Sequence, residues 1–441
     1  MAGPLDDVVV IDLTRALAGP HCAMMLGDMG ARVIKVENPG GGDESRGWGP
    51  PFVGPDDEPV STYFLSCNRN KESVTLDLKT DDGRETLARL VTHADVLLEN
   101  FRPGVLDRLG FSVERLHELN PGLVLLSISG FGHDGPQGGR AGYDQIAQGE
   151  GGLMSLTGAD PEHPQRVGVP IGDLLAGMYG AYGVVSALHE RNRTGKGRVV
   201  RTSLLASIVG VHAFQGTRYT VAGEVGAAGG NHHPSICPYG LFTCADGMIQ
   251  LACGSEGLWV KLAEGFGLDP FAPGFATNRE RVGNRELVIE TLNAAFADLP
   301  HATLMERLAE LGIPAGEVRT LDRVYDWDQT RSHGRARWPW RSSTRCSGRS
   351  RSPGRRSGST TTPSRAGAAN TGTRHGSVST TSACAPGWTR RTRSERAPAP
   401  PRRPRAAGRG ARRGLVRLVG PGPARGCPTR KHLRRPARSS R

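Results

Sequence analysis

The cysteines of this 441-residue chain lack the spacing of a disulfide framework or a zinc site. None of the eight forms a C-x-x-C pair. No apolar stretch approaches the roughly 20 residues needed to span a bilayer, and the N-terminus, where two aspartates soon follow Met1, lacks an export signal. These absences predict a protein that holds no metal, has no membrane partner and works in the reducing cytoplasm. The cysteines before position 335 are Cys22, Cys67, Cys237, Cys244 and Cys253.

Acidic residues are almost absent after position 334. Residues 335–441 carry 28 Arg and Lys residues against the single acid Glu395, whereas residues 1–334 carry a net charge of −14. A segment rich in Arg, Ser, Pro and Gly cannot bury enough apolar surface to offset the cost of ordering its backbone. We therefore expect residues 335–441 to form a non-globular tail. Basic tails bind phosphate backbones, but the tail has few aromatics and no recognisable module, which argues against a nucleic-acid partner.

The tail also has an explanation in the genetic code. Residues 335–362 can be back-translated with GC-rich codons and read in a shifted frame, and one consistent choice gives GSVAVEVVDPVLGPIPVAGPPLRFDDD. The sequence in the shifted frame has the pattern of a folded protein, with a strand, a turn, a second strand and a Pro-rich loop. We hypothesise that the sequence after about Gly334 is the product of a frameshift.

Short apolar runs alternate with longer helical patterns over the first ~200 residues, as expected when parallel strands are joined by crossover helices. A helix is expected over 20–30, and a long one after Gly172, where small and apolar residues recur at three- and four-residue spacing. The pattern predicts an α/β fold with a Rossmann-like large domain over residues 1–217. Its strands are expected at 8–13, 31–36, 73–77, 94–99 and 123–129.

Near Arg218 the composition changes to that of a Gly/His/Pro-rich linker, which is followed by the strand-like runs GLFTCADG and MIQLACG. Helical patterns follow near 258–266, 286–299 and 304–311, so residues 218–334 are expected to form a smaller α+β domain. His232 and His233 lie in the linker without a partner at i+4 or an acidic helper, so they are expected to be exposed loop histidines and not metal ligands.

Several segments between residues 5 and 334 together carry a family resemblance. They include ADVLLENFRPGVLDRLG, GYDQIAQGEGGLMSLTG and VPIGDLLAGMYGAYGVVSALHE. In order and spacing they resemble the class III CoA-transferases, a superfamily that includes formyl-CoA transferase, the carnitine CoA-transferases and α-methylacyl-CoA racemase. The resemblance implies a Rossmann-like large domain, a smaller domain and a homodimer of interlocked subunits. It also implies an acyl-CoA and a carboxylic acid as substrates, with no permanently bound cofactor.

The resemblance assigns the nucleophile to Asp173. In the transferase branch, a carboxylate at this position attacks the acyl-CoA carbonyl, and the resulting anhydride is activated enough for the departing thiolate to attack in turn. Asp173 follows Gly172 at the predicted start of a helix, where the helix dipole favours a charged carboxylate. The alternative is that Asp173 only caps the helix.

Tyr143 stands where the racemase branch of the superfamily provides a histidine for proton transfer. A phenol with a pKa near ~10 is a poor base at neutral pH, so Tyr143 favours CoA transfer, with racemisation or epimerisation of an acyl-CoA as the alternative. Tyr143 is expected either to contact substrate or to pack as a core aromatic.

The resemblance also implies a set of CoA-contacting residues. Arg108 is the expected phosphate partner, because a 3′-phosphoadenosine diphosphate needs cations, although an isolated Arg is more often a solvated charge. Leu17 stands where formyl-CoA transferase has a glutamine, so the polar contact of that glutamine is not expected here. Arg201 stands where relatives tend to carry an acid. The expected contacts are Leu17, Ala18, Leu76, Asp77, Leu78, Lys79, Asn100, Phe101, Arg108 and Tyr143.

Overall fold

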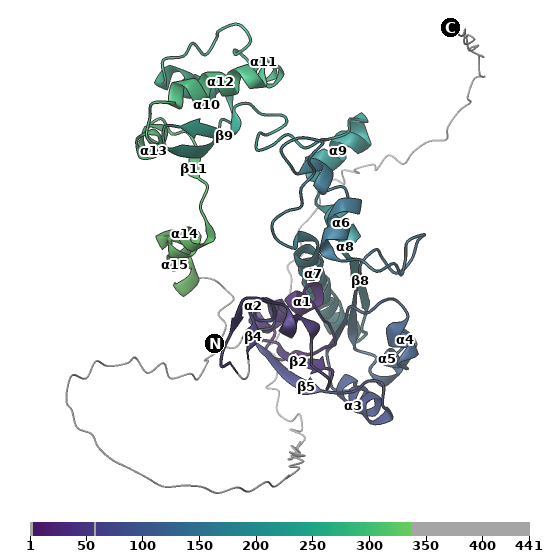
Figure 1. The fold of residues 1–441 in the computed structure, drawn as a ribbon. Coiled ribbons are helices and arrows are strands. Elements are labelled where there is room, and N and C mark those ends of the chain that lie inside the picture. The colour runs from purple at the N-terminus through teal and green to yellow at the C-terminus, as the bar shows by residue number, and fades with distance from the viewer. Residues whose placement is uncertain (1–2, 57–58, 337–441) are drawn as a thin grey trace, which may run out of the picture. The chain divides into compact units, whose positions relative to one another are not determined.

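A six-stranded parallel sheet organises the first two hundred residues of the computed structural model, which describes residues 3–56 and 59–336 (Figure 1). The strand order is β5-β2-β1-β6-β7-β8, and every neighbouring pair is parallel. The chain therefore builds outward from β1 on one side and then from β6 on the other. The strands are β1 (Val9–Asp12), β2 (Arg32–Glu37), β5 (Lys71–Thr75), β6 (Val96–Glu99), β7 (Val124–Ser129) and β8 (Val199–Ser203).

Helices cover both faces of this sheet, which is why its central strands are almost entirely apolar. Helices α1 (Ala18–Asp28) and α7 (Ile171–Thr194) pack on one face, and α3 (Asp81–Val91) and α5 (Val113–Leu119) pack on the other. Smaller elements complete the segment: α2 (Thr62–Cys67), α4 (Val105–Arg108), α6 (Asp144–Glu150), α8 (Leu204–Gly210), α9 (Ala213–Ala222), the short turns Glu44–Gly47 and Met154–Leu156, and the hairpin of β3 (Phe52–Val53) and β4 (Val60–Ser61).

The predicted α/β fold is confirmed, and so are its five expected strands, each to within a few residues. The sixth strand, β8, was not predicted. Its sequence, VVRTS, is short and carries a charge at its centre, so it lacks the continuous apolar run that marks β6 and most of β7.

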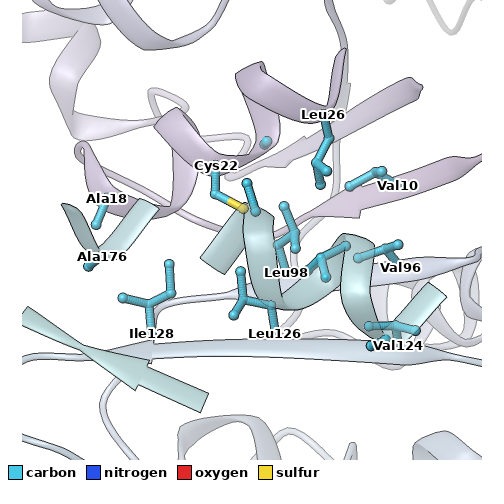
Figure 2. Close-up of a cluster of buried hydrophobic side chains, with 14 of the residues drawn as sticks. Val10, Ala18, Cys22, Leu26, Val96, Leu98, Val124, Leu126, Ile128 and Ala176 are labelled. Carbon is cyan, nitrogen blue, oxygen red and sulfur yellow. The ribbon is translucent and has the colours of Figure 1, made fainter. Parts of the chain in front are cut away.

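The core between the sheet and α1 and α7 is closely packed (Figure 2). Cys22 and Leu26 of α1 point toward Leu98 of β6 and Leu126 of β7, and all four side chains are fully buried. Small residues bring the two helices together: a Cβ on Gly177 would lie 2.6 Å from the carbonyl oxygen of Ala18. Glycine at this position therefore permits the close approach of α1 and α7.

Helix α7 corrects one expectation from the sequence. With 24 residues and a mean hydropathy of 1.3 over its most apolar window, it is long and apolar enough to cross a membrane by length and composition. It packs against α1, α6, α8 and β7, however, and buries residues such as Ala176 and Val184 in the core. This packing accounts for the apolar residues on the buried side of the helix.

Residues 239–317 form a second core around an antiparallel sheet of order β11-β10-β9. Trp259, Phe242 and Phe296 are its largest buried aromatics. The predicted linker begins later than expected, because α9 continues to Ala222; the domain boundaries remain a prediction. The elements are β9 (Tyr239–Cys244), β10 (Gly247–Ala252), β11 (Ala315–Glu317), α10 (Glu256–Gly265), α11 (Asn278–Gly283), α12 (Arg285–Phe296) and α13 (His301–Glu310), followed by α14 (Leu321–Asp326) and α15 (Asp328–Ala336).

Candidate active site

A cavity of about 600 Å³ lies at the carboxyl ends of β1, β6 and β7. Strands β1 and β6 are neighbours from which the chain runs in opposite directions across the sheet, and ligands of open α/β sheets bind at this kind of switch point. The structure brings six of the predicted residues together in its wall: Leu17, Ala18, Asn100, Phe101, Tyr143 and Asp173.

Asp173 lies in the first turn of α7 and is half-buried. Asp173 is not the N-cap of α7, because the N-cap is Pro170. The backbone N–H groups of the first turn donate instead to the carboxylate of Asp144. The Oδ1 atom of Asp144 accepts from the backbone N of Gly172 at 2.7 Å and from that of Asp173 at 3.3 Å. The capping alternative for Asp173 is therefore wrong, and the Asp173 carboxylate stays available for another role.

The electrostatics of Asp173 differ from the expected effect of a helix N-terminus. Burial raises the pKa of the Asp173 carboxyl to about 7, and the negative charge of Asp144 adds to this rise. Because Asp144 takes up the first N–H groups of α7, the helix end does little to stabilise charge on Asp173. A carboxylate that is poorly solvated and lies beside a second negative charge is a stronger base and a stronger nucleophile than an exposed one.

A second cavity, of about 200 Å³, is lined by the predicted residues Leu76, Asp77, Leu78 and Lys79. Arg15, Phe101 and Val105 line both cavities, so the two adjoin along the loop after β6. A ligand with a reactive end and a long, charged tail could therefore extend from Asp173 into the smaller cavity. Lys79, which is exposed, offers a cation at that end.

For Arg108 and Tyr143, two of the predicted contacts, the sequence left an alternative placement open. Arg108 ends α4 as an exposed residue and lines neither cavity. Tyr143 is 70% exposed and lines the larger cavity, so it is not a core aromatic. Of its two expected placements, only the one that can contact substrate agrees with the structure.

Four arginines of the larger cavity were not predicted: Arg15, Arg102, Arg140 and Arg166. Arg140 pairs with Glu150, whereas neither Arg15 nor Arg102 has an ion-pair partner in the part of the chain that the structure describes. The guanidinium of Arg15 lies over the ring of Phe101, 5.3 Å from its centroid. The position of Arg15 directly after a buried strand was the signal in the sequence that could have identified this residue as part of the site.

A buried carboxylate at the end of β6 holds the loop that follows this strand. The buried carboxylate of Glu99 accepts hydrogen bonds from the backbone N of Phe101 at 2.8 Å and from the hydroxyl of Ser127, and Ser127 Oγ lies 2.6 Å from Nε2 of His133. Burial raises the pKa of Glu99, and the charge of Arg201 opposes that rise. Arg201 pairs with Ser127 in the β7–β8 register. Its charge beside a buried carboxylate gives this arginine a physical role.

The linker histidines correct a further expectation. His232 and His233 are partly buried and not exposed. His233 stacks between Phe214 and Tyr239, with ring centroids 5.4 and 5.2 Å away. No group of three His, Cys, Asp or Glu side chains within residues 3–56 and 59–336 is arranged to hold a metal ion.

Comparison with known proteins identifies a family and several relatives with similar sequences or structures. Residues 5–342 match the family model described as CoA-transferase family III. A succinate–glutarate CoA-transferase of Agrobacterium fabrum is 38% identical over 335 residues, which are 75% of this chain and 84% of that protein. A succinyl-CoA:mesaconate CoA-transferase of Haloarcula hispanica is 39% identical over 74% of this chain and 82% of that protein. The crystal structure of a CaiB/BaiF family protein from Brucella suis shares 42% identity with a TM-score of 0.69, covering 76% of this chain and 89% of that one.

Proposed function

Since the chain belongs to CoA-transferase family III, we propose that it moves coenzyme A from an acyl-CoA donor to a carboxylic acid through a covalent intermediate on Asp173. The observation that carries the proposal is the placement of the Asp173 carboxylate in the cavity at the switch point of the sheet, beside Asp144 and with a raised pKa. Enzymes of this family transfer CoA between acids, and this carboxylate supplies a nucleophile for the exchange.

The exchange balances with carboxylate chemistry alone. The Asp173 carboxylate attacks the thioester carbonyl and CoA leaves as a thiolate, which gives a mixed anhydride. The thiolate then attacks the aspartyl carbonyl of the anhydride, which releases the donor acid and leaves an aspartyl-CoA thioester. The acceptor acid repeats both steps in reverse and regenerates the Asp173 carboxylate. Acylation also neutralises Asp173 and so relieves its repulsion from Asp144.

For the acids, we propose dicarboxylic acids with a succinyl-type donor. Relatives in Agrobacterium fabrum, Haloarcula hispanica and Mus musculus are named for transfer between succinate or succinyl-CoA and glutarate or mesaconate. A dicarboxylic acid carries a second carboxylate that needs a cation, and Arg166 lines the cavity in the loop that leads into α7. Its Nη1 donates to the backbone oxygens of Val167 and Gly168, at 2.9 and 3.2 Å, which fixes the guanidinium close to the start of the helix.

The homodimer implied by the family resemblance is part of the proposal. Exposed apolar side chains on α7, namely Met178, Tyr179, Tyr182 and Val185, form a face that a second copy would cover. Light scattering on the purified chain measures its mass in solution. A monomer at micromolar concentration would contradict this part of the proposal.

The decisive experiment follows CoA exchange between succinyl-CoA and isotopically labelled glutarate. The Asp173→Asn and Asp173→Ala variants are expected to lose exchange by at least about a thousandfold, the scale expected when a covalent nucleophile is removed. Mass spectrometry of the unchanged chain after borohydride or hydroxylamine treatment should find the adduct on Asp173. The matched control is Glu162→Gln, an exposed acid in the loop before α7. Full exchange by Asp173→Ala would refute the proposal.

A separate assay distinguishes transfer from racemisation. Incorporation of solvent deuterium at the α-carbon of a branched acyl-CoA, without any acceptor acid, would support a racemase instead. The distant alternative, nucleic-acid binding through the basic tail, concerns residues 335–441, which apart from residues 335 and 336 lie outside those that the structure describes.

A further inference from the structure

Two buried ion pairs lie directly beneath the loop between β1 and α1. Lys35 Nζ lies 2.9 Å from Oδ2 of Asp43, and Lys71 Nζ lies 3.0 Å from Oδ2 of Asp12. The four charged side chains are at most 3% exposed. Burial disfavours ionisation of Asp12, but the charges of Lys71 and Lys35 outweigh it and lower the pKa of Asp12. Burial also opposes the charged form of Lys35, but the charges of Asp12 and Asp43 outweigh it and raise the pKa of Lys35, whereas burial lowers the pKa of Lys71.

Stability alone does not explain such pairs. Removing charges from water costs several kcal/mol per ion, and replacing a buried pair by apolar side chains of similar size is often neutral or stabilising. Buried charged groups of this kind are better explained by a backbone geometry that they hold in place.

That geometry is found in the loop residues Thr14, Arg15 and Ala16. Ala16 has φ +65°, a left-handed conformation that a residue with a Cβ rarely adopts. Strain of this kind persists only where the surroundings over-determine the backbone, and it concentrates at functional sites. Arg15 lines both cavities and Ala16 lines the larger one.

Every peptide group of this loop is fixed by a side chain from another element. Lys35 Nζ donates to the Thr14 carbonyl at 2.8 Å. Asn100 accepts from Arg15 N at 2.9 Å and donates to Arg15 O at 2.8 Å. Asp43 Oδ1 accepts from Ala16 N at 3.3 Å, and the Cys67 thiol lies 3.6 Å from the Ala16 carbonyl.

The Asp43 end of the Lys35–Asp43 pair is also held in place by neighbouring residues. Asp43 Oδ1 accepts from the backbone N and the hydroxyl of Ser45, at 3.0 and 2.8 Å, and Glu37 accepts from the backbone N of Asp43 at 2.9 Å. Lys35 and Asp43 therefore together link this turn to the strained loop.

We propose that Lys35 and Asp43 are positioning residues that hold the loop 14–16, with Ala16 in its left-handed conformation, and thereby place Arg15 at the junction of the two cavities. The ligand of that junction is the coenzyme A of the proposed function, on which this part of the inference rests. A guanidinium fixed there meets the phosphates of CoA without a loss of loop entropy on binding.

The test is the double variant Lys35→Met and Asp43→Asn, which removes both charges at nearly constant volume and leaves the Asp12–Lys71 pair intact. Titration calorimetry with free coenzyme A on the 441-residue chain is expected to show an affinity lower by about tenfold or more, as expected when a binding group loses its fixed position. The melting temperature should stay within a few degrees of that of the unchanged chain, because the removed pair contributes little net stability.

The matched control removes a surface ion pair between β2, the strand that also carries Lys35, and its neighbour β5. Arg32 and Glu72 are 2.8 Å apart and about half exposed. The control variant Arg32→Met and Glu72→Gln should bind coenzyme A like the unchanged chain, because an exposed pair fixes no backbone near the cavities.

Hydrogen–deuterium exchange without ligand supplies a readout that is independent of CoA. The peptide covering residues 14–17 should exchange faster in the double variant and not in the control. If the double variant does not fold, Lys35→Gln with Asp43→Asn, which likewise leaves no unpaired buried charge, takes its place in both measurements. Unchanged exchange at residues 14–17 together with unchanged CoA affinity would overturn the proposal. If the unchanged chain binds no CoA, the proposed function fails, and the exchange at residues 14–17 alone decides the role of Lys35 and Asp43.

Discussion

Asp144 bonds to the backbone of the residue whose carboxylate it opposes: its Oδ1 accepts from Asp173 N while its charge adds to the raised pKa of the Asp173 side chain. Gln148 holds Asp144 by donating to Oδ2 at 2.7 Å. This relationship predicts how exchange depends on pH. In the proposed mechanism only the carboxylate form of Asp173 attacks, so the exchange rate should rise with pH through about 7.

Asp144→Asn keeps an oxygen for the Gly172 N–H and removes the charge. The pKa of Asp173 should then fall, and the rising limb of the pH profile should move to lower pH. At pH 8 the exchange should be slower by roughly three- to tenfold, because a less basic carboxylate is a weaker nucleophile. A pH–rate profile of both proteins measures the shift. A profile that keeps its midpoint while the rate falls would show that Asp144 acts only through the fold.

A second prediction concerns stability. The folded state holds a proton on Asp173 up to a pH of about 7, whereas the unfolded chain releases it near the ordinary value of 3.8. The folded state therefore binds more protons between these values, and the contribution of Asp173 to stability is lost as the pH rises through that window.

Asp173→Asn removes this penalty. At pH 8 its free energy of unfolding should exceed that of the unchanged chain by about 2–4 kcal/mol, at about 1.4 kcal/mol per pKa unit, and the difference should vanish near pH 4. Calorimetric melting at both pH values checks this. Equal melting temperatures at pH 8 would mean that the Asp173 carboxylate is well solvated.

Arg166 should select acids with two carboxylates. Arg166→Gln is expected to raise the KM for glutarate by about ten- to a hundredfold, because a charged group would be left without its partner. The kcat/KM for a monocarboxylic acid of the same length should change little. Arg193→Gln, at the exposed end of α7, is the control. Equal losses for both classes of acid would place the second carboxylate elsewhere.

The frameshift hypothesis predicts a difference between two genes. Resequencing the DNA around the Gly334 codon should reveal the shift, and a frame-restored chain should melt at a higher temperature and exchange CoA faster than the 441-residue chain. Apart from residues 335 and 336, the affected segment lies outside the residues that the structure describes. An intact frame at Gly334, with a stable and active 441-residue protein, would reject the hypothesis.

The sequence predicted most of the large sheet because β1, β6 and β7 are continuous apolar runs. It failed at β8, whose burial depends on neighbours and not on its own pattern. It placed Asp173 at a helix start, but the capping by Asp144 joins residues 29 positions apart. No local pattern reports such a contact. The same holds for Lys35 and Asp43, which read as surface charges until the fold buries them.

The contact of Gly177 with Ala18 joins the two helices that carry opposite walls of the cavity. Asp173 heads one of them and Leu17 precedes the other. Because the two backbones are in contact there, the packing of α1 against α7 sets the spacing of these two walls. For the proposed exchange, a change of acid specificity is therefore expected from side chains and loops at the rim of the cavity, and not from a change in this spacing.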